Sequence, residues 1–179
     1  MQEKSINSTN SYPLFPSFTY TESKAFEDLF RNTCIFNTCA NSDVQFSNAD
    51  LVNQFKYIAE EIEELDQGIC NEDVIEQLDG AVDSIVTLVG YMQKIRNRYG
   101  IDLAKAFDLI AQNNLDKFPK DIATAEATVK MYEAKGIETY IQKNEQYDCY
   151  VIRDKKTDKV KKPIGFIPVN LADCFPKVN

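Results

Sequence analysis

Acidic side chains are the groups in this sequence best suited to do chemistry, and they concentrate in EEIEELDQGICNEDVIEQLDGAVD, residues 60–83. Five of them recur at helical spacing: Glu61, Glu64, Glu76, Asp79 and Asp83. No lysine or arginine lies between positions 57 and 93. Carboxylates without basic partners repel one another and resist burial, and a divalent cation relieves both costs. Oxygen ligands of this kind suit Mg²⁺ or Mn²⁺.

The composition excludes several other kinds of chemistry. The chain of 179 residues contains no histidine, which excludes Ser-His-Asp and Cys-His catalysis, HExxH zinc sites and Glu-x-x-His di-iron sites. A net charge of −8 argues against a nucleic-acid polymer or an anionic membrane as partner. Five cysteines without a CxxC motif, and the absence of a leader-like start, favour a cytoplasmic location. No apolar run is long enough to span a bilayer.

The order of patterns predicts an all-α fold of about five helices with a small C-terminal β-hairpin. An extended N-terminal arm over residues 1–20 precedes a helical domain, 21–140, and a hairpin with a tail, 141–179. The expected helices cover about 21–32 (with Thr21 as N-cap), 48–66, 72–98 and 102–113, followed by a fifth of about fifteen residues closed by Gly136. The hairpin is expected near Tyr147–Gly165, around a charged Asp-Lys turn.

The acidic stretch is expected to lie on two antiparallel helices joined by a short turn, which would bring its carboxylates together. Helix 48–66 has an apolar stripe expected to face inward: Leu51, Phe55, Ile58, Ile62 and Leu65. Gly68 reads as a helix stop and Asn71 as the N-cap of the next helix, with the turn centred near Ile69. This register places Glu61 and Glu64 level with positions 77 and 74. Glu76 and Asp79 would then lie within a turn of them, and Asp83 about one turn beyond.

The simpler interpretation is that such acids are only solvated, as they are on most helix faces. That interpretation is favoured for Glu60 and Glu63, which point away from the apolar stripe. For Glu61 and Glu64 the matching acids of the second helix favour a metal site instead.

These motifs resemble those of the MazG-like all-α nucleoside triphosphate pyrophosphohydrolases, a superfamily that includes dimeric dUTPases and phosphoribosyl-ATP pyrophosphohydrolase. The similar segments are EExxEL from Glu60, ExxDxxxD from Glu76 to Asp83, Gly90, and NNLDKF. Asn114 and Lys117 match the Asn and Lys of an SNxxK segment typical of phage-type members, with Asn113 in place of the serine. The segments ESKAFEDLF and YVIRDKKTDKVKKPIGF are also similar to parts of such proteins.

The resemblance implies hydrolysis of a nucleoside or deoxynucleoside triphosphate to the monophosphate and pyrophosphate. Glu61, Glu64, Asp79 and either Glu76 or Asp83 would hold Mg²⁺ or Mn²⁺, with Glu61 as the favoured proton acceptor. Lys117 would contact phosphate and Asn114 would offer an amide. Tyr57, Gln54 and Tyr91 could contact the base, although ordinary packing explains each equally well. A homodimer or homotetramer is also implied.

Two other functions stay open on the sequence. One is a non-catalytic helical protein that binds a nucleotide, a metal ion or another protein. The other is a hydrolase of cyclic or signalling nucleotides that uses the same acidic residues.

Overall fold

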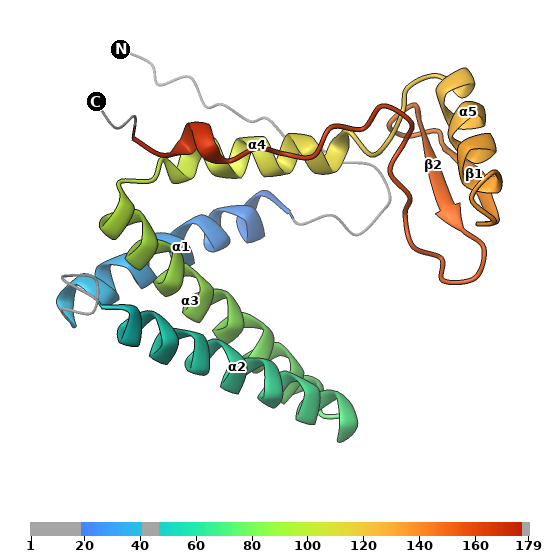
Figure 1. The fold of residues 1–179 in the computed structure, drawn as a ribbon. Helices are drawn as coiled ribbons and strands as arrows, with labels where there is room; N and C mark the ends of the chain where they lie inside the picture. Colours follow the sequence, from blue (N-terminus) through green and yellow to red (C-terminus); the bar gives the residue numbers. More distant parts are fainter. Residues whose placement is uncertain (1–18, 41–46, 177–179) are drawn as a thin grey trace, which may run out of the picture. The chain divides into compact units, whose positions relative to one another are not determined.

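The computed structural model describes residues 19–40 and 47–176, which form five α-helices, two strands and one 3-10 helix (Figure 1). The helices are α1 (Tyr20–Cys39), α2 (Asn48–Cys70), α3 (Val74–Tyr99), α4 (Leu103–Leu115) and α5 (Ile122–Glu133). The strands are β1 (Thr139–Asn144) and β2 (Cys149–Asp154), and η1 covers Ala172–Cys174. The predicted class, helical with a small C-terminal hairpin, is confirmed. The predicted arm, 1–20, lies outside the described residues except for its last two.

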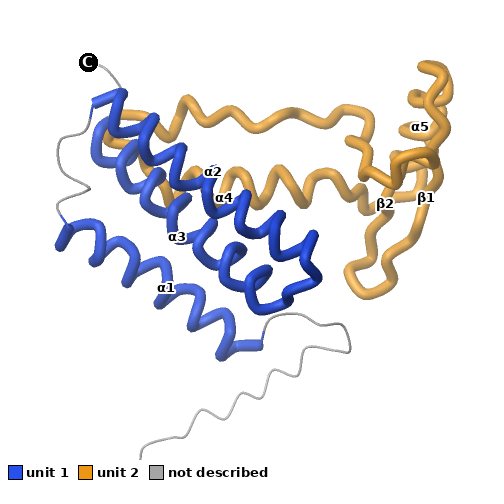
Figure 2. The backbone as a smooth tube through the Cα atoms, turned by 90° about the horizontal axis from the view of Figure 1, so that it is seen from below, with its two compact units in different colours: residues 1–98 blue, residues 99–179 orange. Residues whose placement is uncertain are grey.

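The chain divides into two compact units, residues 1–98 and 99–179 (Figure 2). The first unit contains α1, α2 and α3, and the second contains α4, α5, the hairpin and η1. The sequence pattern grouped all five helices together over 21–140. In the structure α4 contacts η1 and α5 contacts both strands, so these helices belong with the hairpin.

Helix α1 begins earlier than predicted because Thr19, not Thr21, is its N-cap. The Thr19 hydroxyl accepts a hydrogen bond from the Glu22 backbone N–H, and the Glu22 carboxylate accepts one from the Thr19 N–H at 2.6 Å. This reciprocal pair is a capping box, which satisfies two N–H groups that the helix itself leaves unpaired. Helix α1 also continues through the predicted end near residue 32 to Cys39.

Helices α2 and α3 lie antiparallel and side by side (Figures 1 and 2), and two glycines set their closest approach. A Cβ atom on Gly68 would lie 2.7 Å from the backbone nitrogen of Gln77, and one on Gly80 would lie 2.7 Å from that of Leu65. Only glycine lets two backbones come this close. Gly68 is an internal residue of α2, so the prediction that it ends the helix is wrong.

The turn of this hairpin lies at Asn71–Asp73, later than the predicted centre near Ile69. Asn71 caps the end of α2 and does not begin α3, which corrects its predicted role. Asp73 takes that role, because its Oδ1 accepts hydrogen bonds from the backbone N–H groups of Ile75 and Glu76. The predicted register between the two helices is therefore wrong by about two turns.

The face of α2 that is shielded from solvent agrees only in part with the predicted apolar stripe, since Leu51, Ile58 and Leu65 lie on both. Its less exposed residues follow a spacing of three and four, and together they form the inward stripe: Leu51, Gln54, Ile58, Glu61, Leu65 and Gly68. Phe55 and Ile62, predicted to face inward, are 63% and 49% exposed. The glycine contacts decide which face of α2 meets α3, and they override the hydrophobic pattern.

The second unit contains a hairpin that differs from the predicted one. Strands β1 and β2 pair antiparallel from Thr139↔Asp154 to Asn144↔Cys149, so the hairpin starts before the predicted Tyr147. The charged turn that follows β2 is closed by a single bridge between Arg153 and Val160. Strand β1 escaped prediction because TYIQKN alternates weakly and ends in polar residues.

No helix among the described residues combines the length and apolarity needed to cross a membrane. All five cysteines are free thiols.

The close contact at Gly80 gives a first prediction. Gly80→Ala should destabilise the chain by about 1–3 kcal/mol, because the added methyl group meets backbone atoms of α2 that have no room to move. The measurement is the free energy of unfolding from urea denaturation. Gly90→Ala is the matched control, since its Cβ meets only the Gln54 and Asn37 side chains, the nearest at 3.1 Å. Stabilisation by Gly80→Ala, as in an exposed helix, would contradict the close packing.

Candidate metal centre

Glu61 lies on the inward stripe of α2, where it is partly shielded from solvent. Leu65 faces Gly80, and one helical turn back along α2 and forward along α3 leads to Glu61 and Ser84. Asp83, the neighbour of Ser84, is also partly shielded. The structure thus brings Glu61 level with Asp83, whereas the predicted register put position 77 there.

Like charges surround Glu61. Its pKa is raised, first by burial and then by the negative charges of four neighbours: Glu64, Asp83, Glu60 and Asp79. The main contributions to this pKa, which are burial and these four negative charges, all raise it. Two of these acids belong to α2 and two to α3, so the field at Glu61 comes from both helices. The Glu60 charge contributes as well, although the sequence pattern assigned Glu60 to solvent alone.

Glu76 does not belong to this group. The contact of Gly68 with Gln77 places Glu76 level with Ile69, at the turn end of the hairpin. Its charge is not among the main ones that raise the Glu61 pKa. The expectation that Glu76 lies within a turn of Glu61 is wrong, because that expectation placed the turn too early in the chain.

The acids do not form a complete metal site by themselves. The described residues include no group of three or more Asp, Glu or Cys side chains that could hold a metal ion. Magnesium often binds through only one or two carboxylates, keeps several waters and uses substrate phosphates as further ligands. The donor chemistry around Glu61 fits Mg²⁺ or Mn²⁺ held in this way, and it does not fit a preformed cage.

The predicted base-contacting residues of α2 differ in their surroundings. Gln54 lies on the inward stripe, and its Nε2 donates to the backbone carbonyl oxygen of Thr87 at 3.0 Å. Tyr57 lies one turn before Glu61 and is exposed. Gln54 therefore has a structural role, while the Tyr57 ring is accessible.

A polar layer between α1 and α3 was missed in the sequence. Asn37 Nδ2 donates to Gln93 Oε1 at 3.1 Å, and Gln93 Nε2 donates to the Cys34 carbonyl oxygen at 3.2 Å. Gln93, a polar residue among the apolar positions of α3, could have indicated this polar layer. The layer stayed hidden because the predicted first helix ended before Asn37.

Lys94, which follows this layer, is a buried cation that the sequence analysis also left unassigned. The pKa of Asp50 is lowered mainly by hydrogen bonds from Ser47 and to a smaller extent by the Lys94 charge. Lys94 is the first basic residue after the acidic stretch.

Asn114 and Lys117 lie at the end of α4, in the second unit, and they contact each other. Lys117 Nζ donates to Asn114 Oδ1 at 2.7 Å. The pair has the local geometry of a helix-ending turn, in which the Lys117 backbone N–H also donates to the Asn114 carbonyl oxygen. Among the described residues, no carboxylate forms an ion pair with Lys117.

Comparison with known proteins assigns no family. The chain matches no protein-family model, no curated protein and no solved structure.

The like charges around Glu61 give a second prediction. A carboxyl with a raised pKa destabilises the folded state when it is ionised, and this cost disappears as the pH falls below its ordinary pKa. Glu61→Gln should therefore stabilise the metal-free protein at neutral pH, by about 0.5 kcal/mol, and the gain should vanish near pH 4. Urea denaturation in the presence of a chelator, repeated across this pH range, measures the difference.

Glu63→Gln is the control for that experiment, because Glu63 is exposed and is not among the main contributors to the raised Glu61 pKa. An equal gain from both substitutions would mean that only net charge matters.

Proposed function

We propose that the chain hydrolyses a nucleoside or deoxynucleoside triphosphate to the monophosphate and pyrophosphate, with Mg²⁺ or Mn²⁺ as cofactor. One observation carries the proposal: acids from α2 and α3 together raise the pKa of the partly shielded Glu61, and every main contribution to this pKa raises it. Such an arrangement costs stability and is explained if a divalent cation and an anionic substrate complete it. The residue pattern shared with MazG-like pyrophosphohydrolases supports the same reaction.

Glu61, Glu64, Asp79 and Asp83 would hold the metal, which, when bound, supplies charge neutralisation for the triphosphate and acidifies a coordinated water. Glu61 is the favoured proton acceptor, as a carboxylate that could hydrogen-bond to that water. The water oxygen forms a bond to phosphorus, and the bond from phosphorus to the bridging oxygen breaks. The water proton passes to Glu61, and attack at the α or β phosphorus gives the same two products.

Other residues enter the proposal on the sequence pattern alone. Lys117 would contact phosphate as a point charge, and Asn114 would offer its amide. Tyr57, exposed one turn from Glu61, could stack on a base. Gln54 is the weaker candidate, since its amide already bonds to the Thr87 carbonyl oxygen.

A second candidate function is a non-catalytic binder of nucleotides or metal ions. It would use the same acidic side chains around Glu61 and the exposed Tyr57, and it needs no catalytic water. Such a protein would bind ligand at the acidic face and release no product.

A panel of the common NTPs and dNTPs with Mg²⁺, with products resolved by chromatography, tests the reaction. Glu61→Gln and Asp83→Asn should each lower pyrophosphate release by about a hundredfold or more while the circular dichroism stays unchanged. Glu63→Gln serves as the control and should keep full activity. Substrate binding without any turnover in the parent protein would favour the non-catalytic binder, and release of inorganic phosphate with the diphosphate would refute this reaction.

We further propose that the first unit self-associates, as a homodimer or a homotetramer. Large apolar side chains on both helices of the hairpin are exposed in the single chain: Val52, Phe55, Ile62 and Ile69 on α2, and Ile75, Leu78 and Leu88 on α3. Monomeric soluble proteins rarely leave so many apolar side chains together in water. A second copy of the same helices would cover them, as in most soluble oligomers.

Phe55→Gln and Leu78→Gln should convert the oligomer to a monomer, because both side chains are more than half exposed in the single chain and should contribute little to its folding. Sedimentation equilibrium over a range of concentrations measures the mass. Ile122→Gln, on α5 of the second unit, is the matched control. A parent protein that stays monomeric at the highest concentration would refute self-association.

A further inference from the structure

The second unit contains a cavity of about 750 Å³ that the proposed hydrolysis does not use. It lies between the end of α4, the segment that leads to α5, and the hairpin. Three lining residues of β2, namely Cys149, Val151 and Arg153, alternate along the strand and so share one face of the sheet. Their partners Asn144, Gln142 and Tyr140 on β1 lie on the same face.

The cavity has an apolar base and apolar walls. Cys149 and Val151 are 5% and 8% exposed, so the base is buried. Phe118 and Tyr147 add two aromatic rings, and Leu115 adds an aliphatic side chain that is 61% exposed. A volume of several hundred Å³ with mostly apolar walls is typical of sites for small organic molecules. Two rings in the lining favour a planar ligand, because aromatic faces stack on flat groups.

Polar groups in the lining leave a positive charge available. Lys120 Nζ donates to the backbone carbonyl oxygen of Tyr147 at 2.8 Å, and no carboxylate pairs with it among the described residues. Asn144 Oδ1 accepts from the Tyr147 N–H at 3.1 Å, which leaves the Asn144 amide NH₂ to donate. The one carboxylate of the lining, Asp116, accepts a hydrogen bond from Gln112 Nε2 at 2.8 Å.

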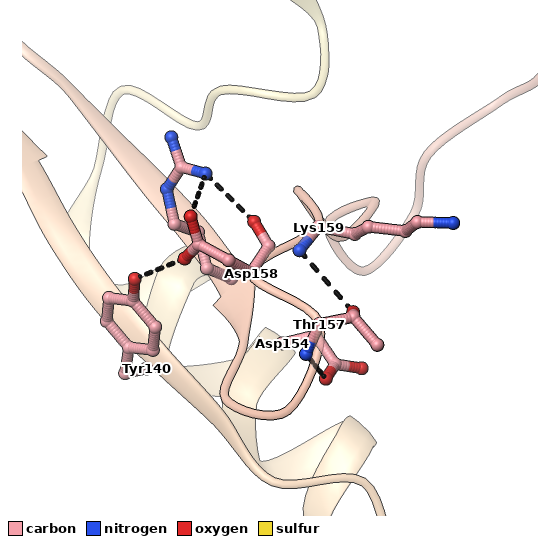
Figure 3. A network of polar contacts seen from close by, with 6 residues as sticks. Tyr140, Asp154, Thr157, Asp158 and Lys159 are labelled. Carbon is pink, nitrogen blue, oxygen red and sulfur yellow. Dashed lines mark hydrogen bonds and ion pairs between the residues drawn. The ribbon is translucent and has the colours of Figure 1, made fainter. Parts of the chain in front are cut away.

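Hydrogen bonds around the turn after β2 hold Arg153 in place. Figure 3 shows this turn, with Tyr140 and Asp158 labelled. Arg153 Nη1 donates to the Asp158 carbonyl oxygen at 2.9 Å and lies 3.2 Å from the Asp158 Oδ2. The Tyr140 hydroxyl donates to the other carboxylate oxygen of Asp158 at 2.7 Å. With its guanidinium fixed in this way, Arg153 adds a second, partly neutralised positive charge to the lining without further ordering cost.

We propose that this cavity binds a small organic anion built on a planar ring. The ring would lie over the apolar base against Phe118 and Tyr147, and the anionic group would bind Lys120 with help from the Asn144 amide. Two kinds of molecule share this chemistry, namely nucleoside monophosphates and aromatic carboxylates. The proposal does not depend on the hydrolase, because none of the lining residues belongs to the acidic stretch.

The experiment uses two probes, adenosine 5′-monophosphate and 2-naphthoate, titrated into the full chain in the presence of a chelator. Backbone amide shifts of Tyr147, Cys149 and Val151 in ¹H–¹⁵N spectra should saturate with at least one probe. Neither probe is a substrate of the proposed hydrolysis, and the chelator prevents metal-dependent binding at the acidic residues, so the outcome is separate from that of the hydrolysis assay. The probe that binds more tightly identifies the kind of anion.

Two substitutions and one neutral analogue decide whether the site is as described. Lys120→Gln should weaken binding roughly tenfold, as expected for loss of a charge-assisted hydrogen bond, and Leu115→Ala should weaken it through lost apolar contact. Lys130→Gln, an exposed lysine on α5 outside the lining, should leave the affinity unchanged. 2-Naphthamide should bind more weakly than 2-naphthoate. Absence of saturable shifts at these amides, or equal affinity for the amide and the carboxylate, would overturn the proposal.

Discussion

The first unit depends on backbone contact between α2 and α3 at Gly68 and Gly80. These two contacts fix the register of the hairpin and the face of α2 that turns inward. Glu61 lies on that face because it precedes Leu65 by four residues and Gly68 by seven, which is one and two helical turns. The acidic character of the candidate site is therefore a consequence of where two glycines allow the helices to meet. A larger residue at either position would move every carboxylate relative to its neighbours.

Local signals explain how much of the fold could be predicted. The start of α2, most of α3 and the whole of α4 follow periodic apolar residues and polar caps, and their predicted bounds lie within a few residues of the structure. Gly68 misled the prediction because the same residue type ends helices and permits close helix packing. Only the partner helix decides between these two uses, and no local pattern contains that information.

The candidate site shows the same division between local and long-range information. Glu61, Glu64, Asp79 and Asp83 could be selected from spacing and from the absence of nearby lysine or arginine. The exclusion of Glu76 could not be predicted, because it depends on where the turn between α2 and α3 lies. The sequence pattern placed that turn too early in the chain. The inward position of Gln54 and the bond between Asn37 and Gln93 also depend on contacts between helices far apart in the sequence. The cavity beside β2 could not be predicted either, because the sequence pattern did not reveal β1, the strand that pairs with β2.

The two units also differ in the balance of their charges: repulsion between acids prevails in the first unit, and ion pairs occur in the second. Residues 1–98 contain sixteen acidic and seven basic residues, whereas residues 99–179 contain twelve and thirteen. In the second unit Lys161 pairs with Asp154 at 2.8 Å, and this bond, with backbone N–H donors, lowers the Asp154 pKa to about 2. Dissolved salt screens repulsion and attraction alike. Rising ionic strength should therefore tighten the helical hairpin around Glu61 while it loosens the ion pairs beside β2, so that one solvent variable acts in opposite directions on the two halves of a single chain.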